Sequence, residues 1–89
     1  MNIRLIQWDV DAWEEYCDWQ QKNKDVVKRI NQLVRDIKRN PYDGIGKPEA
    51  LKGNLSGFWS RRINGEHRIV YAIADNAVVI VSCRGHYDD

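Results

Sequence analysis

The chain has 89 residues, of which 43% are hydrophobic and 30% charged, and its formal net charge is +1 at pH 7. This length predicts one domain, residues 1–89, and the composition argues against a disordered chain, which would have fewer apolar residues and a larger net charge. No apolar run approaches the roughly 20 residues that cross a bilayer, and the start is too short and polar for a signal peptide. We therefore expect a cytoplasmic protein with no membrane contact.

The charges are distributed unevenly along the chain. Residues 1–20 carry one base and five acids, a net charge of −4, whereas residues 22–84 carry 13 bases and six acids, a net charge of +7. A basic body of this kind suits a polyanionic partner on one face. A solvated charged surface has the same composition, so charge alone does not distinguish the two.

A short strand and two helices are predicted first. Residues 3–8 read as a strand with Ile3 and Leu5 on one face, and a helix capped by Asp11 follows to about residue 21. After a break at 22–24, with Asp25 as the second cap, apolar residues recur at helical spacing from 26 to 37. Asn40-Pro41 ends this helix, and the short break predicts an antiparallel helical hairpin.

Residues 41–57 contain two prolines and four glycines, which predicts a loop, or a short edge strand near 50–52. Strands are then expected at 58–63, 66–73 and 77–84, with Asn64-Gly65 as a two-residue hairpin turn. The predicted fold class is α+β, an antiparallel meander covered by the two helices.

The predicted hairpin brings arginines face to face. A two-residue turn places Arg61 opposite Arg68 and Arg62 opposite His67. Like charges in cross-strand register are unfavourable, but two guanidinium groups form a good phosphate clamp. The alternative is that both side chains extend into water.

Two further residues have the chemistry for proton transfer. His86 follows the last strand and precedes Tyr87, and histidine exchanges protons near neutral pH. Glu49 is a loop carboxylate between Lys47 and Lys52, and it can act as a base. The ordinary alternatives are a frayed terminus for His86 and a loop salt bridge for Glu49.

Together these residues match the needs of RNA cleavage without a metal: a base, cations, an acid and an aromatic surface. The two histidines and two cysteines lack the spacing of a metal site, and no phosphate loop or nucleophile elbow is present. We therefore expect no metal and no other cofactor. Cys17 and Cys83 are expected to be reduced and buried, with a disulfide or a nucleophilic Cys83 as alternatives.

Several stretches resemble the YoeB-type toxins of the RelE/ParE toxin–antitoxin superfamily, and the likeness runs almost end to end. They include Gly46-Lys47-Pro48-Glu49, Ser56-Gly57-Phe58-Trp59-Ser60-Arg61-Arg62-Ile63, Glu66-His67-Arg68 and Cys83-Arg84-Gly85-His86-Tyr87. The resemblance implies a RelE-like fold and a ribosome-dependent mRNA endoribonuclease that cuts in the A site. It also implies a YefM-type antitoxin as partner, and often a homodimer.

The resemblance also implies roles for particular residues. The general base falls on Glu49, the transition-state arginine on Arg68, the general acid on His86 and the terminal aromatic on Tyr87. RNA binding falls on the neighbouring bases Lys47, Lys52, Arg61, Arg62 and Arg84.

The sequence departs from the family at two places. Gly85 stands where an aromatic residue usually precedes the catalytic histidine, and Asp88 and Asp89 extend the chain past Tyr87. Three alternatives stay open at this point: a non-catalytic RNA-binding or ribosome-binding module, a gyrase poison on the same fold, and an inactive remnant.

Overall fold

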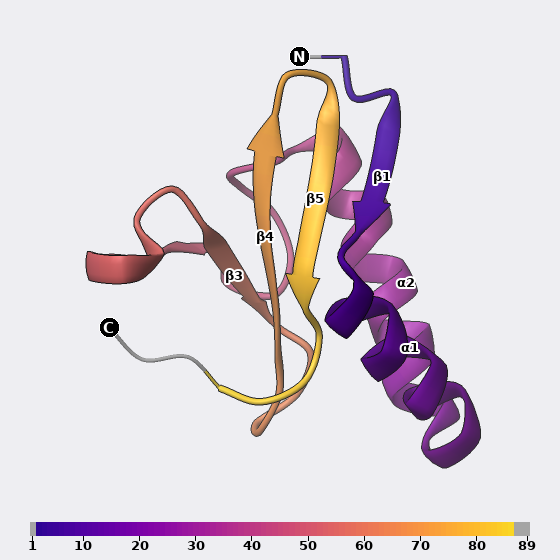
Figure 1. Ribbon diagram of the computed structural model, residues 1–89. Helices are drawn as coiled ribbons and strands as arrows, with labels where there is room; N and C mark the ends of the chain where they lie inside the picture. Colours follow the sequence, from indigo (N-terminus) through magenta and orange to yellow (C-terminus); the bar gives the residue numbers. More distant parts are fainter. Residues whose placement is uncertain (1, 87–89) are drawn as a thin grey trace.

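The computed structural model describes residues 2–86 and shows two helices packed against a five-stranded sheet (Figure 1). The elements in chain order are β1 (Leu5–Trp8), α1 (Val10–Lys22), α2 (Lys24–Arg39), β2 (Glu49–Ala50), the 3-10 helix η1 (Gly53–Leu55), β3 (Trp59–Arg62), β4 (Arg68–Ala74) and β5 (Ala77–Ser82). The predicted α+β class is confirmed. Within residues 2–86, no helix is long and apolar enough to cross a membrane.

The strands lie in the order β1-β5-β4-β3-β2. Strands β2 to β5 are antiparallel neighbours, as predicted, but β1 runs parallel to β5, with Leu5 opposite Ala77. A parallel pair needs a long crossover connection, and here both helices and strands β2, β3 and β4 all lie in the chain between β1 and β5. The sheet is therefore mixed, not wholly antiparallel.

The apolar face of α2 provides much of the core, as its spacing predicts. Val26, Ile30, Leu33 and Ile37 are buried against residues of β4 and β5. Full burial of each such side chain contributes roughly 1.5–3 kcal/mol. Figure 1 shows α1 running antiparallel beside α2, and the Tyr16 hydroxyl donates to Asn31 Oδ1 across them at 2.7 Å.

Both helices start earlier than predicted, so their caps differ. The Asp9 carboxylate, not that of Asp11, accepts from the Ala12 N–H at 2.7 Å at the start of α1. Asn23, not Asp25, caps α2, because its Oδ1 accepts the N–H groups of residues 25 and 26.

The structure separates Ile3 from Leu5, which were predicted to share one face of the first strand. Ile6 and Trp8 pack against the core, whereas Leu5 is 49% exposed. Ile3 precedes the strand and packs inward as well.

Candidate functional site

The hairpin register differs from the prediction by one residue. Arg62 lies opposite Arg68, and Arg61 lies opposite Ile69. The predicted two-residue turn is wrong, because the N–H groups of Ile63 and Asn64 both donate to the His67 carbonyl and the loop covers residues 64–66. A shift of one residue moves side chains to the other face of a strand, so it is Arg62, not Arg61, that faces Arg68.

Arg62 and Arg68 approach each other closely across the hairpin. The Arg62 N–H donates to the Gly46 carbonyl at 2.6 Å and the Arg68 N–H to the Gly85 carbonyl at 2.9 Å, so both amides point away from the opposite strand. This is the geometry of a non-hydrogen-bonded antiparallel pair, in which side chains lie nearest. Within this pair, the Arg68 guanidinium donates from Nη1 to the carbonyls of Asn64 and His67, at 3.1 and 3.3 Å. Like charges in cross-strand register are unfavourable, and an anion such as a phosphate would relieve that repulsion.

Glu49 lies on the same face of the sheet as this arginine pair. It is opposite Ser60, which lies two residues before Arg62 on β3. Side chains two positions apart share a face, so Glu49, Arg62 and Arg68 project from one side. The intervening Arg61 projects toward the helices from the other side. Glu49 and Arg62 are exposed, and Arg68 is half-buried.

The chain after β5 brings His86 to the start of β4. Gly85 accepts from the Arg68 N–H through its carbonyl, and its own N–H donates to His67 Nδ1 at 2.9 Å. Figure 1 shows this segment passing the base of the β3–β4 hairpin. The exposed His86 follows directly. Tyr87, predicted as the terminal aromatic, lies outside the described residues, as do Asp88 and Asp89.

The remaining predicted RNA-binding residues occupy different places. Lys47 is exposed, has a positive φ of 54° and follows Gly46, whose carbonyl accepts the Arg62 N–H. Lys52 is exposed at the start of η1. Arg84 lies against α1, where its Nη1 is 3.1 Å from Asp18 Oδ2. The structure thus brings Lys47 near the arginine pair and turns Arg84 toward the acidic first helix.

Arg61 is not part of the exposed surface, which corrects the expectation that it binds RNA. Its side chain is fully buried. All five of its N–H donors are used, by Tyr71 Oη, Asp36 Oδ2 and the carbonyls of Asn40, Asp43 and Ile45. Arg61 therefore holds the 40–45 loop in place from inside the protein.

Sequence reasoning missed the partner of Arg61. Asp36 is buried on α2, three residues after Leu33 and beside Ile37. An acidic residue at a position on the apolar face of this helix was the one feature of the sequence that could have indicated a buried ion pair. Burial raises the pKa of Asp36, but the Ile45 N–H and the Arg61 guanidinium outweigh burial and hold the pKa below its usual value of 3.8.

The cysteines are free, and their positions disfavour covalent chemistry. Cys83 is buried, its thiol donates to the Ala12 carbonyl at 3.6 Å, and burial, followed by the nearby Glu15, raises its pKa to about 12. A thiol of this kind stays protonated near neutral pH and is a poor nucleophile. Cys17 is half-buried.

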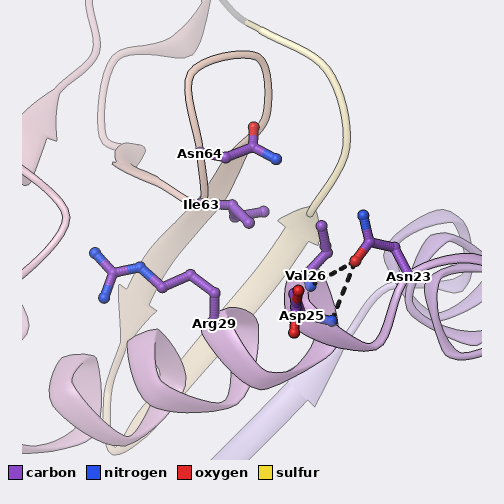
Figure 2. Close-up of a pocket in the computed structure, with 6 residues that line it drawn as sticks. All are labelled: Asn23, Asp25, Val26, Arg29, Ile63 and Asn64. Carbon is purple, nitrogen blue, oxygen red and sulfur yellow. Dashed lines mark hydrogen bonds between the residues drawn. The ribbon is translucent and has the colours of Figure 1, made fainter.

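A pocket of about 300 Å³ lies away from the arginine pair, between the start of α2 and the β3–β4 turn (Figure 2). It is lined by Asn23, Asp25, Val26, Arg29, Ile63 and Asn64. Ile63 belongs to the core on the helix side of the sheet, so this pocket opens on the opposite face from Glu49. Among residues 2–86, no three His, Cys, Asp or Glu side chains are grouped to hold a metal ion.

Known proteins resemble this chain over nearly its whole length. The sequence model of a family described as "YoeB-like toxin of bacterial type II toxin-antitoxin system" matches residues 8–87. Toxin YoeB of Escherichia coli K12 is 54% identical over 85 residues, which covers 96% of this chain and 100% of that protein. Toxin YoeB of Synechocystis sp. is 60% identical over 76 residues, which covers 85% and 88%.

Solved structures of YoeB-type toxins have the same fold as this chain. A YoeB/ParE toxin from Agrobacterium tumefaciens superimposes with a TM-score of 0.92 at 42% identity, covering 94% of this chain and 100% of that one. A YoeB dimer from Staphylococcus aureus gives 0.89 at 49% identity, covering 98% and 100%. A heterotetrameric YoeB-YefM complex from the same organism gives 0.87 at 52% identity, covering 94% and 99%.

Proposed function

Because this chain belongs to the YoeB-like toxins of bacterial type II toxin–antitoxin systems, we propose that it is an endoribonuclease that cuts mRNA in the ribosomal A site and thereby inhibits translation. The main structural support for this proposal is the relative position of four residues. Glu49, Arg62 and Arg68 share one face of the sheet, and the residue before His86 is hydrogen-bonded to the Arg68 backbone. A base, a cation pair and an acid are the parts that such a reaction needs.

The proposed reaction is a metal-independent transesterification. Glu49 takes the proton of the ribose 2′-hydroxyl, whose oxygen attacks the neighbouring phosphorus. The bond from phosphorus to the 5′-oxygen breaks, and protonated His86 donates its proton to that oxygen. Arg68, with Arg62 opposite, stabilises the charge that develops on the phosphoryl oxygens. The products are a 2′,3′-cyclic phosphate and a 5′-hydroxyl, and Tyr87 is proposed to stack on a base.

The basic body of the chain would hold the RNA. Lys47, Lys52 and Arg62 are exposed and are proposed to contact phosphates of the mRNA or the ribosomal RNA. Such contacts provide affinity that falls as salt rises. The acidic residues 9–18 are concentrated around α1, so a polyanion would approach from elsewhere.

The proposed partners follow from the relatives. A YefM-type antitoxin would neutralise the toxin, because a similar YoeB is described in a complex with YefM. A homodimer is proposed because another similar YoeB is described as a dimer. Both the ribosome and the antitoxin imply a cytoplasmic protein.

Mapping mRNA 5′ ends on ribosomes shortly after induction tests this function. The wild type is expected to create new 5′ ends within codons in the A site, and His86→Gln is expected to create almost none. Growth arrest by both proteins without new ends would overturn the proposal in favour of a non-catalytic binding module. DNA damage with intact mRNA would overturn it in favour of a gyrase poison.

A further inference from the structure

His67 lies where three parts of the chain meet. Its ring packs edge-to-face on Trp19 of α1, with centroids 4.9 Å apart, and its side chain is only 15% exposed. Trp19 in turn donates from Nε1 to the Cys83 carbonyl at 2.9 Å. The helix, the hairpin turn and the segment after β5 therefore pack around one imidazole.

The hydrogen bond at His67 Nδ1 defines the state of the ring. The partner is the backbone N–H of Gly85, which can only donate. Nδ1 is therefore the acceptor in this hydrogen bond, and the ring hydrogen lies on Nε2. The carboxylate of the exposed Glu66 lies 3.7 Å from Nε2, beyond a good hydrogen bond. In this state His67 is an acceptor aimed at the last described residues of the chain.

Side-chain packing does not fix Gly85. The residue has no side chain, its φ is +89°, and a Cβ added there would meet nothing within 4 Å. Its two backbone hydrogen bonds, from its N–H to His67 Nδ1 and from the Arg68 N–H to its carbonyl, are the contacts that hold it. Because His86 is the next residue, these bonds also limit where its imidazole can reach.

We propose that His67 is a positioning residue for the cleavage reaction: its Nδ1 holds Gly85 and thereby keeps His86 beside Arg68. The catalytic part of this inference rests on the proposed function, since it takes His86 to be the acid. His67 itself does not touch the RNA in this account. Its contribution is to raise the fraction of molecules in which His86 stands ready to protonate the leaving oxygen.

Two substitutions of similar size separate this role from packing. In His67→Asn, the Oδ1 atom can accept the Gly85 N–H in place of Nδ1, whereas His67→Leu has no acceptor. Both variants lose the ring that packs on Trp19, so a difference between them reports the hydrogen bond. The measurements are the single-turnover cleavage rate and KM on programmed ribosomes, and amide hydrogen exchange at Gly85. Exchange at the Ile63 N–H, which donates to the His67 carbonyl, reports whether the hairpin stays intact.

The expected result follows from the strength of one hydrogen bond. In His67→Leu, Gly85 exchange should speed up about threefold to tenfold, and the maximal cleavage rate should fall by a similar factor. KM and Ile63 exchange should change little, and His67→Asn should restore both properties most of the way. Equal behaviour of the two variants, or faster Gly85 exchange with unchanged cleavage, would overturn the positioning role. If the wild type cut no RNA, the proposed function and this role would both fail, and Gly85 exchange would still decide whether His67 holds the segment.

Discussion

Arg61 and Asp36 form a buried ion pair, with Arg61 Nη1 2.6 Å from Asp36 Oδ2. The pair joins β3 to α2, and the same two side chains bind backbone groups of residues 40–45. The Gly46 carbonyl then accepts the Arg62 N–H, and Glu49 follows three residues later. An interior ion pair thus fixes the path of the segment that leads to the proposed base.

The ion pair predicts a loss of stability in acid. Burial raises the pKa of Asp36, but the Ile45 N–H and Arg61 lower it more, to below 3.8. A carboxyl whose pKa is lower in the folded state stabilises the fold above its unfolded pKa and loses this effect as pH falls through the folded pKa. Urea unfolding from pH 5 to pH 2 should show this fall in the free energy of unfolding below pH 3.8. The decrease in the free energy of unfolding between pH 5 and pH 2 should be smaller in Asp36→Asn and unchanged in Asp75→Asn, which serves as an exposed control. An unchanged decrease in Asp36→Asn would contradict the assignment of this pH dependence to Asp36.

Removing one hydroxyl from the same network should be costly. Tyr71 Oη accepts from Arg61 Nε at 3.1 Å and donates to the Pro41 carbonyl at 2.6 Å. Tyr71→Phe removes the hydrogen-bond partner of the buried Arg61 Nε and of the partly buried Pro41 carbonyl, so the free energy of unfolding should fall by about 1–3 kcal/mol. Tyr42→Phe, which removes a hydroxyl from an exposed tyrosine, is the control for urea unfolding. Equal stability of the two variants would show that the network contributes little.

The facing arginines should make opposite contributions to stability and activity. Arg62→Gln removes a like-charge pair, so the free energy of unfolding should stay equal or rise by about 0.2–1 kcal/mol. The same change removes a charged contact to RNA, so cleavage should fall about tenfold to a hundredfold. Arg35→Gln on the exposed surface of α2 serves as the control in both assays. Full cleavage by Arg62→Gln would remove Arg62 from the proposed clamp.

The two terminal carboxylates should not assist the reaction. Asp88 and Asp89 follow Tyr87 directly, and negative charge near a bound phosphate opposes binding. Deletion of both residues is expected to leave the cleavage rate on programmed ribosomes equal or higher. The full-length chain assayed at the same salt is the reference, and a clear fall after deletion would contradict this expectation.

Local residue patterns predicted the elements better than the contacts between them. The apolar spacing of α2 and the Asn40-Pro41 stop gave a correct helix, because helical periodicity is a local property. The hairpin register was missed because Asn64 uses its side chain within the turn, accepting the N–H groups of Glu66 and His67. That closure adds one residue to the loop and exchanges the roles of Arg61 and Arg62.

Other features depended on the tertiary structure. Asp36 and Arg61 are 25 positions apart, and nothing in either local pattern indicates that they pair. The parallel course of β1 likewise depends on how the helical pair returns the chain to the sheet. For the site, residue chemistry and family resemblance suggested Glu49, Arg68 and His86. Only the register of the sheet shows that Glu49 and Arg68 lie on the same face.

The most direct test of the account is the single-turnover cleavage rate on programmed ribosomes for Glu49→Ala, His86→Gln and the double variant. Each acid or base should contribute on the order of 10²–10⁴-fold, so each single variant should be nearly inactive. Both are exposed residues, so urea unfolding should show wild-type stability. A double variant that cleaves at the full wild-type rate would contradict the central claim that Glu49 and His86 act on one phosphodiester.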